Sequence, residues 1–284
     1  MSLINKLSRF IYALRHIKPI YEFGGVSSVT IATPSYSDIL EGKCVLVTGG
    51  SSGIGYAIAK KCLEVGAVVI ITGRNKEKLE KAIHGLNTAN CHYIVWDISD
   101  IEAIPCKLLS CEELTKQKID IIINNAGVAP TKFFGSVDEE EWNKIYDNNL
   151  KGTYFLCQEI TKHWKKTQFK GYKKIINISS QGGFVGASYP YRMTKWDIRG
   201  LTEGLGSLLI KDRIIVNGIA PGVVKTSMQS FSLLQGDNLY TNQNPIERVI
   251  LPEEIAELAL FLMSDASNAI VGQTIVCDGG YILK

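Results

Sequence analysis

The sequence lacks three features that mark particular classes of protein. No uninterrupted apolar run approaches the roughly 18 residues of a membrane-spanning helix, so we do not expect an integral membrane protein. The formal net charge is only +3, which is too small to predict a nucleic-acid partner. Apolar residues make up 45% of the chain and charged residues 21%, a composition that excludes a disordered protein.

A recognisable metal site is also lacking. The sequence has seven cysteines, but no Cys-x-x-Cys pair and no histidine partner at zinc-finger spacing. The nearest candidate cluster, Cys91 and His92 with Cys106 and Cys111, has no ligand spacing, so we expect buried free thiols and no metal. An odd, scattered set of cysteines is typical of a reducing compartment and predicts a cytoplasmic protein.

From residue 43 onward, short β-branched runs alternate with longer segments of helical period. The expected strands are 43–48, 67–72, 91–96, 119–124, 174–179, 213–219 and 273–277. The expected helices are 54–65, 75–86, 101–117, 138–166, 189–210 and 252–264. This alternation predicts a single α/β domain, in which one parallel seven-stranded sheet is covered by helices on both faces.

Two stretches lie outside this repeat. Residues 1–41 precede the first strand and form an extension to the domain at 42–284. Residues 225–248 are a polar insertion with scattered apolar side chains, which we interpret as a substrate lid. No arginine or lysine lies between Lys225 and Arg248, so this lid disfavours a heavily charged substrate.

The start of the extension carries apolar residues at three- and four-residue intervals, with basic residues among them and no acidic residue before Glu22. This pattern predicts a basic amphipathic helix. Three roles stay open for it: docking on the domain or on a subunit partner, contact of residues 1–20 with an anionic membrane surface, or an organelle-targeting presequence. Charges interrupt the apolar stretch and no small-residue cleavage site follows, which disfavours a secretory signal.

Six lysines lie in the basic run at 161–174, where the expected helix 138–166 gives way to a strand. Cations stabilise a helix C-terminus, because the unpaired carbonyl groups there carry partial negative charge. We therefore expect solvated lysines that compensate the helix dipole, with a binding patch as the alternative.

A glycine turn follows the first strand and leads directly into a helical pattern. It reads Thr48-Gly49-Gly50-Ser51-Ser52-Gly53-Ile54-Gly55. Glycine permits the sharp turn and lets the backbone approach phosphate oxygens, while the helix N-terminus offers unpaired N–H groups to an anion. This context predicts a dinucleotide site in a Rossmann-like, doubly wound fold, with a ligand-free glycine turn as the alternative.

Tyr191 and Lys195 are four residues apart in a segment of helical period. Both side chains therefore project from one face of a helix. An unperturbed tyrosine has a pKa near ~10, and a neighbouring ammonium stabilises the phenolate and lowers this pKa. The spacing predicts a tyrosine that exchanges protons near neutral pH.

The glycine spacing Gly-x-x-x-Gly-x-Gly and the motifs after it resemble the short-chain dehydrogenase/reductase family, and within it the 3-oxoacyl-ACP reductases. The motifs occur in that family's order: Asn124-Asn125-Ala126-Gly127, Asn149 in Asn-Leu-Lys-Gly, Ser180, Tyr191-x-x-x-Lys195, Pro221-Gly222 and Asp278-Gly279-Gly280. The resemblance covers about residues 41–284. It implies hydride transfer between a nicotinamide and a carbonyl or alcohol, in a homotetramer or homodimer built on helices 138–166 and 189–210.

The resemblance also implies roles for the candidate catalytic residues. Tyr191 would give its proton to the carbonyl oxygen, and Lys195 would bind the nicotinamide ribose as well. Ser180 would be the second donor to the developing alkoxide. Ser179 is the fallback, because the interval from Ser180 to Tyr191 is eleven residues, two fewer than in the family. Asn149 would hold a water in a proton relay from the lysine to solvent.

The choice of cofactor depends on the end of the second strand, where Arg74 offers a forked cation to a 2′-phosphate. We therefore predict NADP(H), with NAD(H) less favoured. Ser51 could donate a second hydrogen bond to that phosphate, and by resemblance Asp97 meets the adenine and Thr226 the nicotinamide carboxamide. The predicted cofactor-binding residues are Gly49, Ser51, Ser52, Gly53, Ile54, Gly55, Arg74, Asp97, Ile98, Asn125, Ala126, Gly127, Tyr191, Lys195, Pro221, Gly222, Val224 and Thr226.

These observations predict an NADP(H)-dependent ketoreductase that acts on a small-molecule carbonyl or alcohol. The alternative is a catalytically idle NADP(H)-binding sensor or scaffold, held at a membrane through its first helix. A lost reactive residue would indicate the alternative, and none of the family's reactive residues is lost from this sequence.

Overall fold

The computed structural model describes residues 37–226 and 239–283. The strands are β1 Cys44–Thr48, β2 Val68–Gly73, β3 Cys91–Val95, β4 Ile121–Asn124, β5 Lys173–Ile178, β6 Ile214–Pro221 and β7 Thr274–Cys277. The helices are α2 Gly53–Glu64, α3 Lys76–Leu86, α4 Ile104–Thr115, α5 Glu139–Tyr146, α6 Gly152–Lys165, α7 Pro190–Leu209 and α8 Pro252–Met263. The amphipathic extension, except for its last residues, and the middle of the predicted lid lie outside the described residues.

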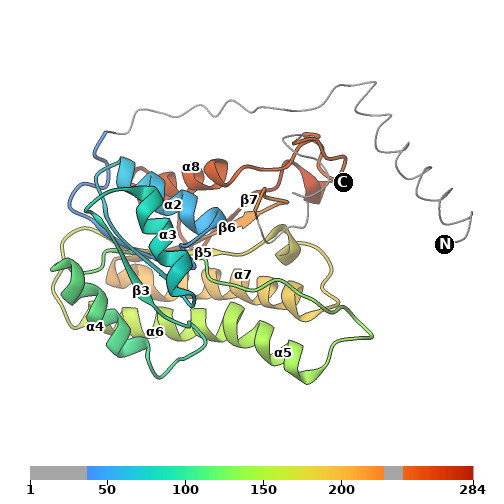
Figure 1. Cartoon of the computed structure of the whole chain (residues 1–284), viewed down its shortest axis with the longest axis horizontal. Coiled ribbons are helices and arrows are strands. Elements are labelled where there is room, and N and C mark those ends of the chain that lie inside the picture. Colours follow the sequence, from blue (N-terminus) through green and yellow to red (C-terminus); the bar gives the residue numbers. More distant parts are fainter. Residues whose placement is uncertain (1–36, 227–238, 284) are drawn as a thin grey trace, which may run out of the picture.

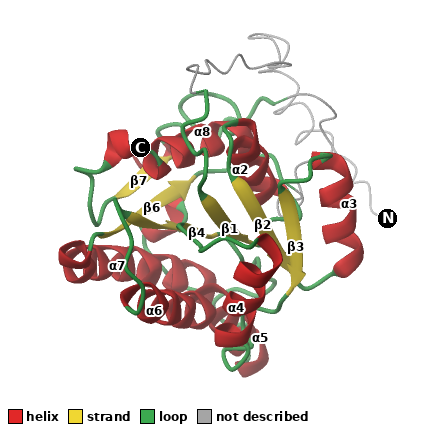
Figure 2. Cartoon of the chain, turned by 90° about the vertical axis from the view of Figure 1, so that its left-hand side faces the viewer, coloured by secondary structure: helices red, strands yellow, loops and turns green. Residues whose placement is uncertain are grey.

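All seven strands are parallel, in the order β3-β2-β1-β4-β5-β6-β7. Figure 1 shows the sheet edge-on between two layers of helices, and Figure 2 shows α2 and α8 on one side of it with α4, α6 and α7 on the other. The expected α/β fold is therefore confirmed. The chain order reverses between β1 and β4, and a crevice forms beyond the carboxyl ends of strands at such a switch point.

The alternation of side chains along each strand fills two separate cores. In β1, Val45 and Val47 pack with residues of α2 and α8, whereas Cys44 and Leu46 pack with residues of α4 and α6. Every residue of β1 is buried, which explains why the strand reads as a continuous apolar run rather than an alternating one. The central strands thereby form a rigid support for the loops at their carboxyl ends.

The helix expected at 138–166 is interrupted. The side chain of Asp138 caps α5 by accepting a hydrogen bond from the backbone N–H of Glu141 at 3.0 Å. Residues Asp147–Lys151 then form a π-helical turn before α6 begins. The spacing of apolar residues does not reveal such a turn, because a π-helical turn adds one residue to the helix while the same face stays buried. Asn149 lies within this turn.

Two lysines of the basic run are buried in β5 rather than solvated. The Nζ of Lys173 donates to the Asp120 carboxylate at 2.7 Å, and Lys173 is 5% exposed. The Nζ of Lys174 donates to the backbone carbonyls of Leu262 and Ser264 at the end of α8, and burial lowers the pKa of Lys174 to about 8. The prediction of solvated lysines is therefore wrong at these two positions, because their partners come from distant parts of the chain.

The described residues contain neither a membrane-spanning helix nor a cluster of metal ligands. No helix among them is long and apolar enough to cross a membrane. Within the same ranges, no three or more His, Cys, Asp or Glu side chains gather in a way that would hold a metal ion.

Candidate functional site

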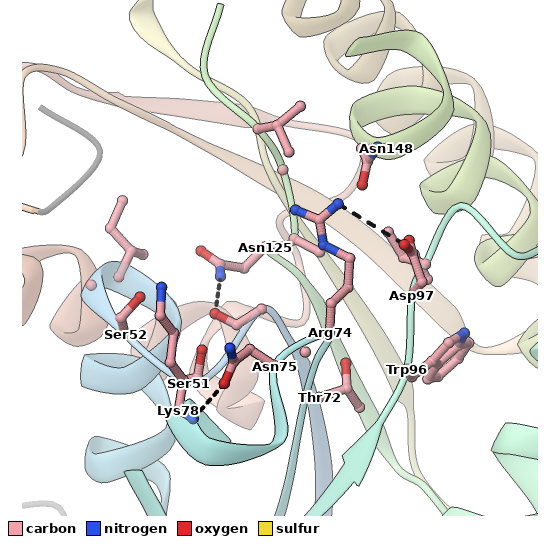
Figure 3. Close-up of a pocket in the computed structure, with 18 of the residues that line it drawn as sticks. Ser51, Ser52, Thr72, Arg74, Asn75, Lys78, Trp96, Asp97, Asn125 and Asn148 are labelled. Carbon is pink, nitrogen blue, oxygen red and sulfur yellow. Dashed lines mark hydrogen bonds and ion pairs between the residues drawn. The ribbon is translucent and has the colours of Figure 1, made fainter. Parts of the chain in front are cut away.

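A cavity of about 560 Å³ lies beyond the carboxyl ends of β1 to β4, at the switch point of the sheet. Figure 3 shows its polar side chains, which come from the glycine turn, the ends of β2 and β3, and the loop after β4. Its lining includes Gly49, Ser51, Ser52, Gly53, Ile54, Arg74, Asp97, Ile98, Asn125, Ala126, Gly127 and Thr226. A cavity of this size suits an elongated organic ligand.

The glycine turn has a backbone conformation that side chains oppose. Gly49 and Gly53 have φ angles of +65° and +57°. A Cβ on Gly55 would lie 2.4 Å from the amide nitrogen of Asn125, so only glycine lets α2 pack this closely on the strand end. The side chain of Ser52, at the N-cap, makes no capping bond, and the first turn of α2 holds no acidic residue. This end of α2 therefore suits an anion, and the cradle fits the diphosphate of a dinucleotide.

The side chain of Asn125 holds the turn in shape. Its Nδ2 donates to the backbone carbonyls of Thr48 and Gly49, each at 3.0 Å. The hydroxyl of Thr48 in turn accepts from the backbone N–H of Asn125 at 3.0 Å. Asn125 thus lines the cleft, but its amide braces the glycine turn rather than reaching for a ligand.

Two cations border the end of β2. The guanidinium of Arg74 reaches across the cleft to Asp97, with 3.9 Å between Nη1 and Oδ2. Lys78 lies beside Ser51 and Ser52 in Figure 3, on the first turn of α3. The predicted site did not include Lys78, although its place in the first turn of the helix that follows Arg74 was a usable signal.

A second, smaller cavity of about 80 Å³ brings together residues from β5, α7 and β6. Ser180, Tyr191 and Lys195 line it, together with Pro221, Gly222 and Val224. Ile54, Asn125, Gly127 and Thr226 border both cavities, so the two belong to one continuous cleft. The proposed proton donors thus lie at one end of the cleft, and the glycine cradle lies at the other.

The prediction that the ammonium lowers the pKa of Tyr191 is wrong for this structure. Burial raises the pKa of Tyr191, the hydrogen bond with Ser180 lowers it, and Tyr189 raises it further. The Nζ of Lys195 lies 5.6 Å from the centroid of the Tyr191 ring and donates to the carbonyl of Ile178 at 3.0 Å. The lysine is 6% exposed, and burial lowers its own pKa to about 8.

The two adjacent serines face different partners. The hydroxyl of Ser180 accepts from the backbone N–H of Gly182 at 3.1 Å and is hydrogen-bonded to Tyr191. The hydroxyl of Ser179 instead donates to the backbone carbonyl of Lys195 at 2.8 Å, and Ser179 is buried. Ser180 is therefore the better placed donor, and Ser179 fixes α7 to the end of β5.

Asn149 does not line either cavity. Its Oδ1 accepts from the backbone N–H of Val128 at 2.7 Å, and its Nδ2 donates to the carbonyl of Val128 at 3.1 Å. Both bonds fasten the π-helical turn to the loop after β4. Gly55 is the other predicted residue outside the lining, since it packs beneath the turn. The remaining predicted site residues all border the cleft.

Known proteins with similar sequences include reductases and an alcohol dehydrogenase. A family model described as "Enoyl-(Acyl carrier protein) reductase" matches residues 49–282. The chain is 33% identical over 252 residues to the 3-oxoacyl-[acyl-carrier-protein] reductase FabG of Aquifex aeolicus. This alignment covers 85% of this chain and 98% of that protein. It is 35% identical over 253 residues to the NADP-dependent (R)-specific alcohol dehydrogenase of Lentilactobacillus kefiri, covering 86% and 98%.

Solved structures agree with the curated relatives. The 3-ketoacyl-(acyl-carrier-protein) reductase of Brucella melitensis, in complex with NADH, superposes with a TM-score of 0.78 and 28% identity. The superposition covers 86% of this chain and 99% of that one. The likeness therefore extends over the whole domain, including both ends of the cleft.

Proposed function

The chain belongs to the short-chain dehydrogenase/reductase family, and we propose that it is an NADP(H)-dependent ketoreductase. The relatives named above are reductases and an alcohol dehydrogenase, which act on carbonyl or alcohol groups. One observation carries this proposal. Ser180, Tyr191 and Lys195 share a small cavity that opens into the glycine-lined cleft, so a carbonyl there meets two hydroxyl donors beside the nucleotide.

The chemistry divides between the cofactor and the protein. A nicotinamide bound in the cleft would supply the hydride that the carbonyl carbon accepts. The hydroxyl of Ser180 donates to the carbonyl oxygen and stabilises the negative charge that develops on it. Tyr191, whose raised pKa keeps its phenol protonated near neutral pH, gives its proton to the same oxygen and completes the alcohol.

Lys195 would return that proton, and Asn149 would keep the neighbouring loop in place. The phenolate left on Tyr191 regains a proton from the Lys195 ammonium, which in turn regains one from solvent. Lys195 also binds the nicotinamide ribose hydroxyls. Asn149 acts by position, since its amide clamps the loop at Val128 and holds the π-helical turn against the cleft.

The preference for NADP(H) rests on charge at the ribose end. Arg74 and Lys78 are cations that line the cleft beside Ser51, where a 2′-phosphate would lie, and they would repay its desolvation. The name of one relative specifies NADP, whereas one neighbouring structure holds NADH. The relatives therefore do not decide between NADP(H) and NAD(H), and the proposed preference depends on Arg74 and Lys78 of this chain.

Four further features belong to the proposal. Residues 225–248 would form the lid over substrate, and residues 1–41 an extension to the domain at 42–284. The protein would be cytoplasmic, as its free cysteines suggest. A homodimer or homotetramer would form on the long helices, where Trp142, Tyr154 and Trp196 leave aromatic surface exposed.

The test of the proposed function is Tyr191→Phe, assayed by loss of NADPH absorbance with a panel of aldehydes and ketones. We expect kcat to fall by about 10²- to 10⁴-fold, because the substitution removes the general acid and little else. Tyr172→Phe, at a half-buried tyrosine that precedes β5 and lines neither cavity, is the matched control and should keep the wild-type rate. Full turnover by Tyr191→Phe would refute the assigned proton donor.

The idle-binder alternative makes a different prediction in the same assay. It requires NADPH to bind, as followed by nucleotide fluorescence, without oxidation by any carbonyl in the panel. The three reactive side chains of the cavity are all present, which favours the enzyme.

A further inference from the structure

Two adjacent phenylalanines are exposed on the loop that follows β4. Phe133 is 55% exposed and Phe134 is 87% exposed. The loop turns tightly here, since the backbone N–H of Ser136 donates to the carbonyl of Phe133 at 2.9 Å and the Ser136 hydroxyl donates to the same carbonyl at 2.9 Å. Two large rings held in water on a closed turn are unfavourable unless they contact something.

The turn is held in place rather than free to collapse onto the core. The carboxylate of Glu141, which is 4% exposed, accepts from the backbone N–H of Thr131 at 2.6 Å and of Lys132 at 3.3 Å. The side chain of Lys132 pairs with Asp138, the cap of α5. The start of α5 therefore fixes the loop, and with it the direction in which the two rings project.

This loop touches the helix that carries the proposed proton donor. The rings of Phe133 and Tyr189 meet edge to face, with 5.0 Å between their centroids and 76° between their planes. Tyr189 is the N-cap of α7 and lies two residues before Tyr191. Figure 1 shows the loop before α5 and the turn before α7 at the same end of the molecule. The aromatic surface of Phe133, Phe134 and Tyr189 therefore lies next to the helix turn that holds Tyr191, although none of its three residues lines the reactive cavity itself.

The reactive cavity itself holds little. Its volume of about 80 Å³ accommodates a reacting carbonyl but not the rest of a larger substrate. The remainder of such a molecule must extend out of the cavity. The aromatic surface offers it exposed apolar area, which Tyr189 connects to the helix turn of Tyr191. Apolar surface buried against these rings would contribute to binding in proportion to its area.

Cations close to this surface are already engaged. Lys132 pairs with Asp138. Arg192 donates to the carbonyl of Gly186 at 3.1 Å and lies 5.4 Å from the Tyr189 ring centroid. Arg199 stacks 4.3 Å from the Phe184 ring centroid. Each of these cations therefore already has a partner, which is a carboxylate for Lys132, a carbonyl and a ring for Arg192, and a ring for Arg199.

We propose that the aromatic surface of Phe133, Phe134 and Tyr189 binds the apolar substituent of the substrate, and that the enzyme reduces uncharged ketones with an extended apolar chain rather than thioesters on a phosphate-bearing carrier. This inference rests on the proposed function and adds the substrate class to it. The reaction is the same ketone reduction: the carbonyl carbon would receive a hydride from the nicotinamide, and the carbonyl oxygen would receive a proton from Tyr191.

The test is a homologous series of methyl ketones, from 2-butanone through 2-hexanone to 2-octanone, with acetoacetyl coenzyme A as the charged comparison. Each methylene that leaves water against the rings should raise kcat/KM about fourfold. In Phe133→Ala and Tyr189→Ala, this increase with chain length should flatten, so that the ratio of kcat/KM for 2-octanone to 2-butanone falls at least tenfold. Leu109→Ala, an exposed apolar residue on α4, should leave the ratio unchanged.

Phe134→Ala is a variant that we expect to fold normally, because a side chain that is 87% exposed contributes little to stability. It should flatten the series in the same direction. An equal slope in wild type and in all three aromatic variants overturns the inference, as does a higher kcat/KM for acetoacetyl coenzyme A than for 2-octanone. Either result leaves the ketoreductase proposal standing. Binding of NADPH without reduction of any of these carbonyls would instead refute the proposed function.

Discussion

Burial controls the proton chemistry of the two residues at the centre of the cleft. Tyr191 keeps its proton at neutral pH, because desolvation raises its pKa, and the same shift makes the phenolate left after proton transfer a stronger base. Lys195 loses its proton more easily than an exposed lysine, because the same burial lowers its pKa to about 8. The pair is therefore arranged for reduction at neutral pH, with a protonated phenol and an ammonium that can replace its proton.

A pH profile follows from the lysine. Lys195 is charged below pH 8 and becomes neutral as the pH rises through about 8. If the ammonium supplies the returning proton, kcat/KM for NADPH in ketone reduction should be level below this pH and fall with unit slope above it. Lys195→Arg keeps its charge throughout, so its residual activity should show no such fall. A wild-type profile that stays level well above the lysine pKa contradicts this role.

The cofactor preference is a second prediction at this scale. Arg74→Ala and Lys78→Ala should each weaken NADPH binding about 10- to 100-fold while leaving NADH binding within about twofold, because each removes a charge-assisted bond to the 2′-phosphate. Fluorescence titration with both nucleotides measures this. Lys76→Ala, a neighbour paired with Glu80 outside the cavity, should change neither affinity. An equal loss of affinity for NADPH and NADH would contradict a contact between these side chains and the 2′-phosphate.

Spacing predicted part of the site well. Four residues of helical separation placed Tyr191 and Lys195 at one cavity, and the resemblance to the family placed Ser180 there too. The direction of the Tyr191 pKa shift was missed, because burial depends on side chains that pack from β5 and β6. The amide contacts of Asn149 with Val128 were also missed, since they depend on how the π-helical turn aims the side chain.

Among the elements, β5 and α8 depend on a buried amine. The Nζ of Lys174 donates to Leu262 and Ser264, whose carbonyls end α8, and to the hydroxyl of Ser267 at 3.2 Å. Helix C-termini leave such carbonyls without partners. The lysine therefore acts as a cap supplied by a neighbouring strand.

Lys174→Met should lower the free energy of unfolding by about 1–3 kcal/mol at neutral pH, because it removes a buried amine that donates to two carbonyls, which then keep their bonds from Ser267. The folded pKa of about 8 lies below the ordinary lysine pKa of 10.5, so the unfolded chain holds more protons between these pH values. Wild-type stability relative to the variant should therefore rise as the pH increases from about 8 to about 10. Urea denaturation at both pH values measures the difference.

Lys170→Met, an exposed lysine of the same basic run, is the control and should change stability by less than about 0.5 kcal/mol. If both variants lose the same stability, the buried cap is not needed. A difference that shrinks as the pH rises would contradict the sign of the lysine pKa shift.

Elements with strong local patterns were predictable. The β-branched runs gave the strands to within one or two residues, because strands buried on both faces need continuous apolar sequence. The interruption of the helix at Asp147–Lys151 and the burial of Lys173 were not predictable. Both depend on partners that are distant in sequence, and local spacing carries no information about those partners.

For the whole molecule, the order of the strands explains where the site lies. The reversal between β1 and β4 leaves room for a ligand at their carboxyl ends, and β5 with β6 extends the same edge toward Ser180 and Pro221. Ile54 and Thr226 line both cavities and come from opposite halves of the chain. The fold thus joins a nucleotide cradle to a proton-donating cavity along one edge of the sheet.

The most direct measurement follows deuterium from NADPH labelled at the nicotinamide C4 into the alcohol product. With 2-octanone and the wild-type protein, mass spectrometry should find the label on the carbinol carbon, and Tyr191→Phe should form this product at least about 100-fold more slowly. Product that forms without the label, or that forms with it at the wild-type rate in Tyr191→Phe, would contradict hydride transfer to a carbonyl protonated by Tyr191.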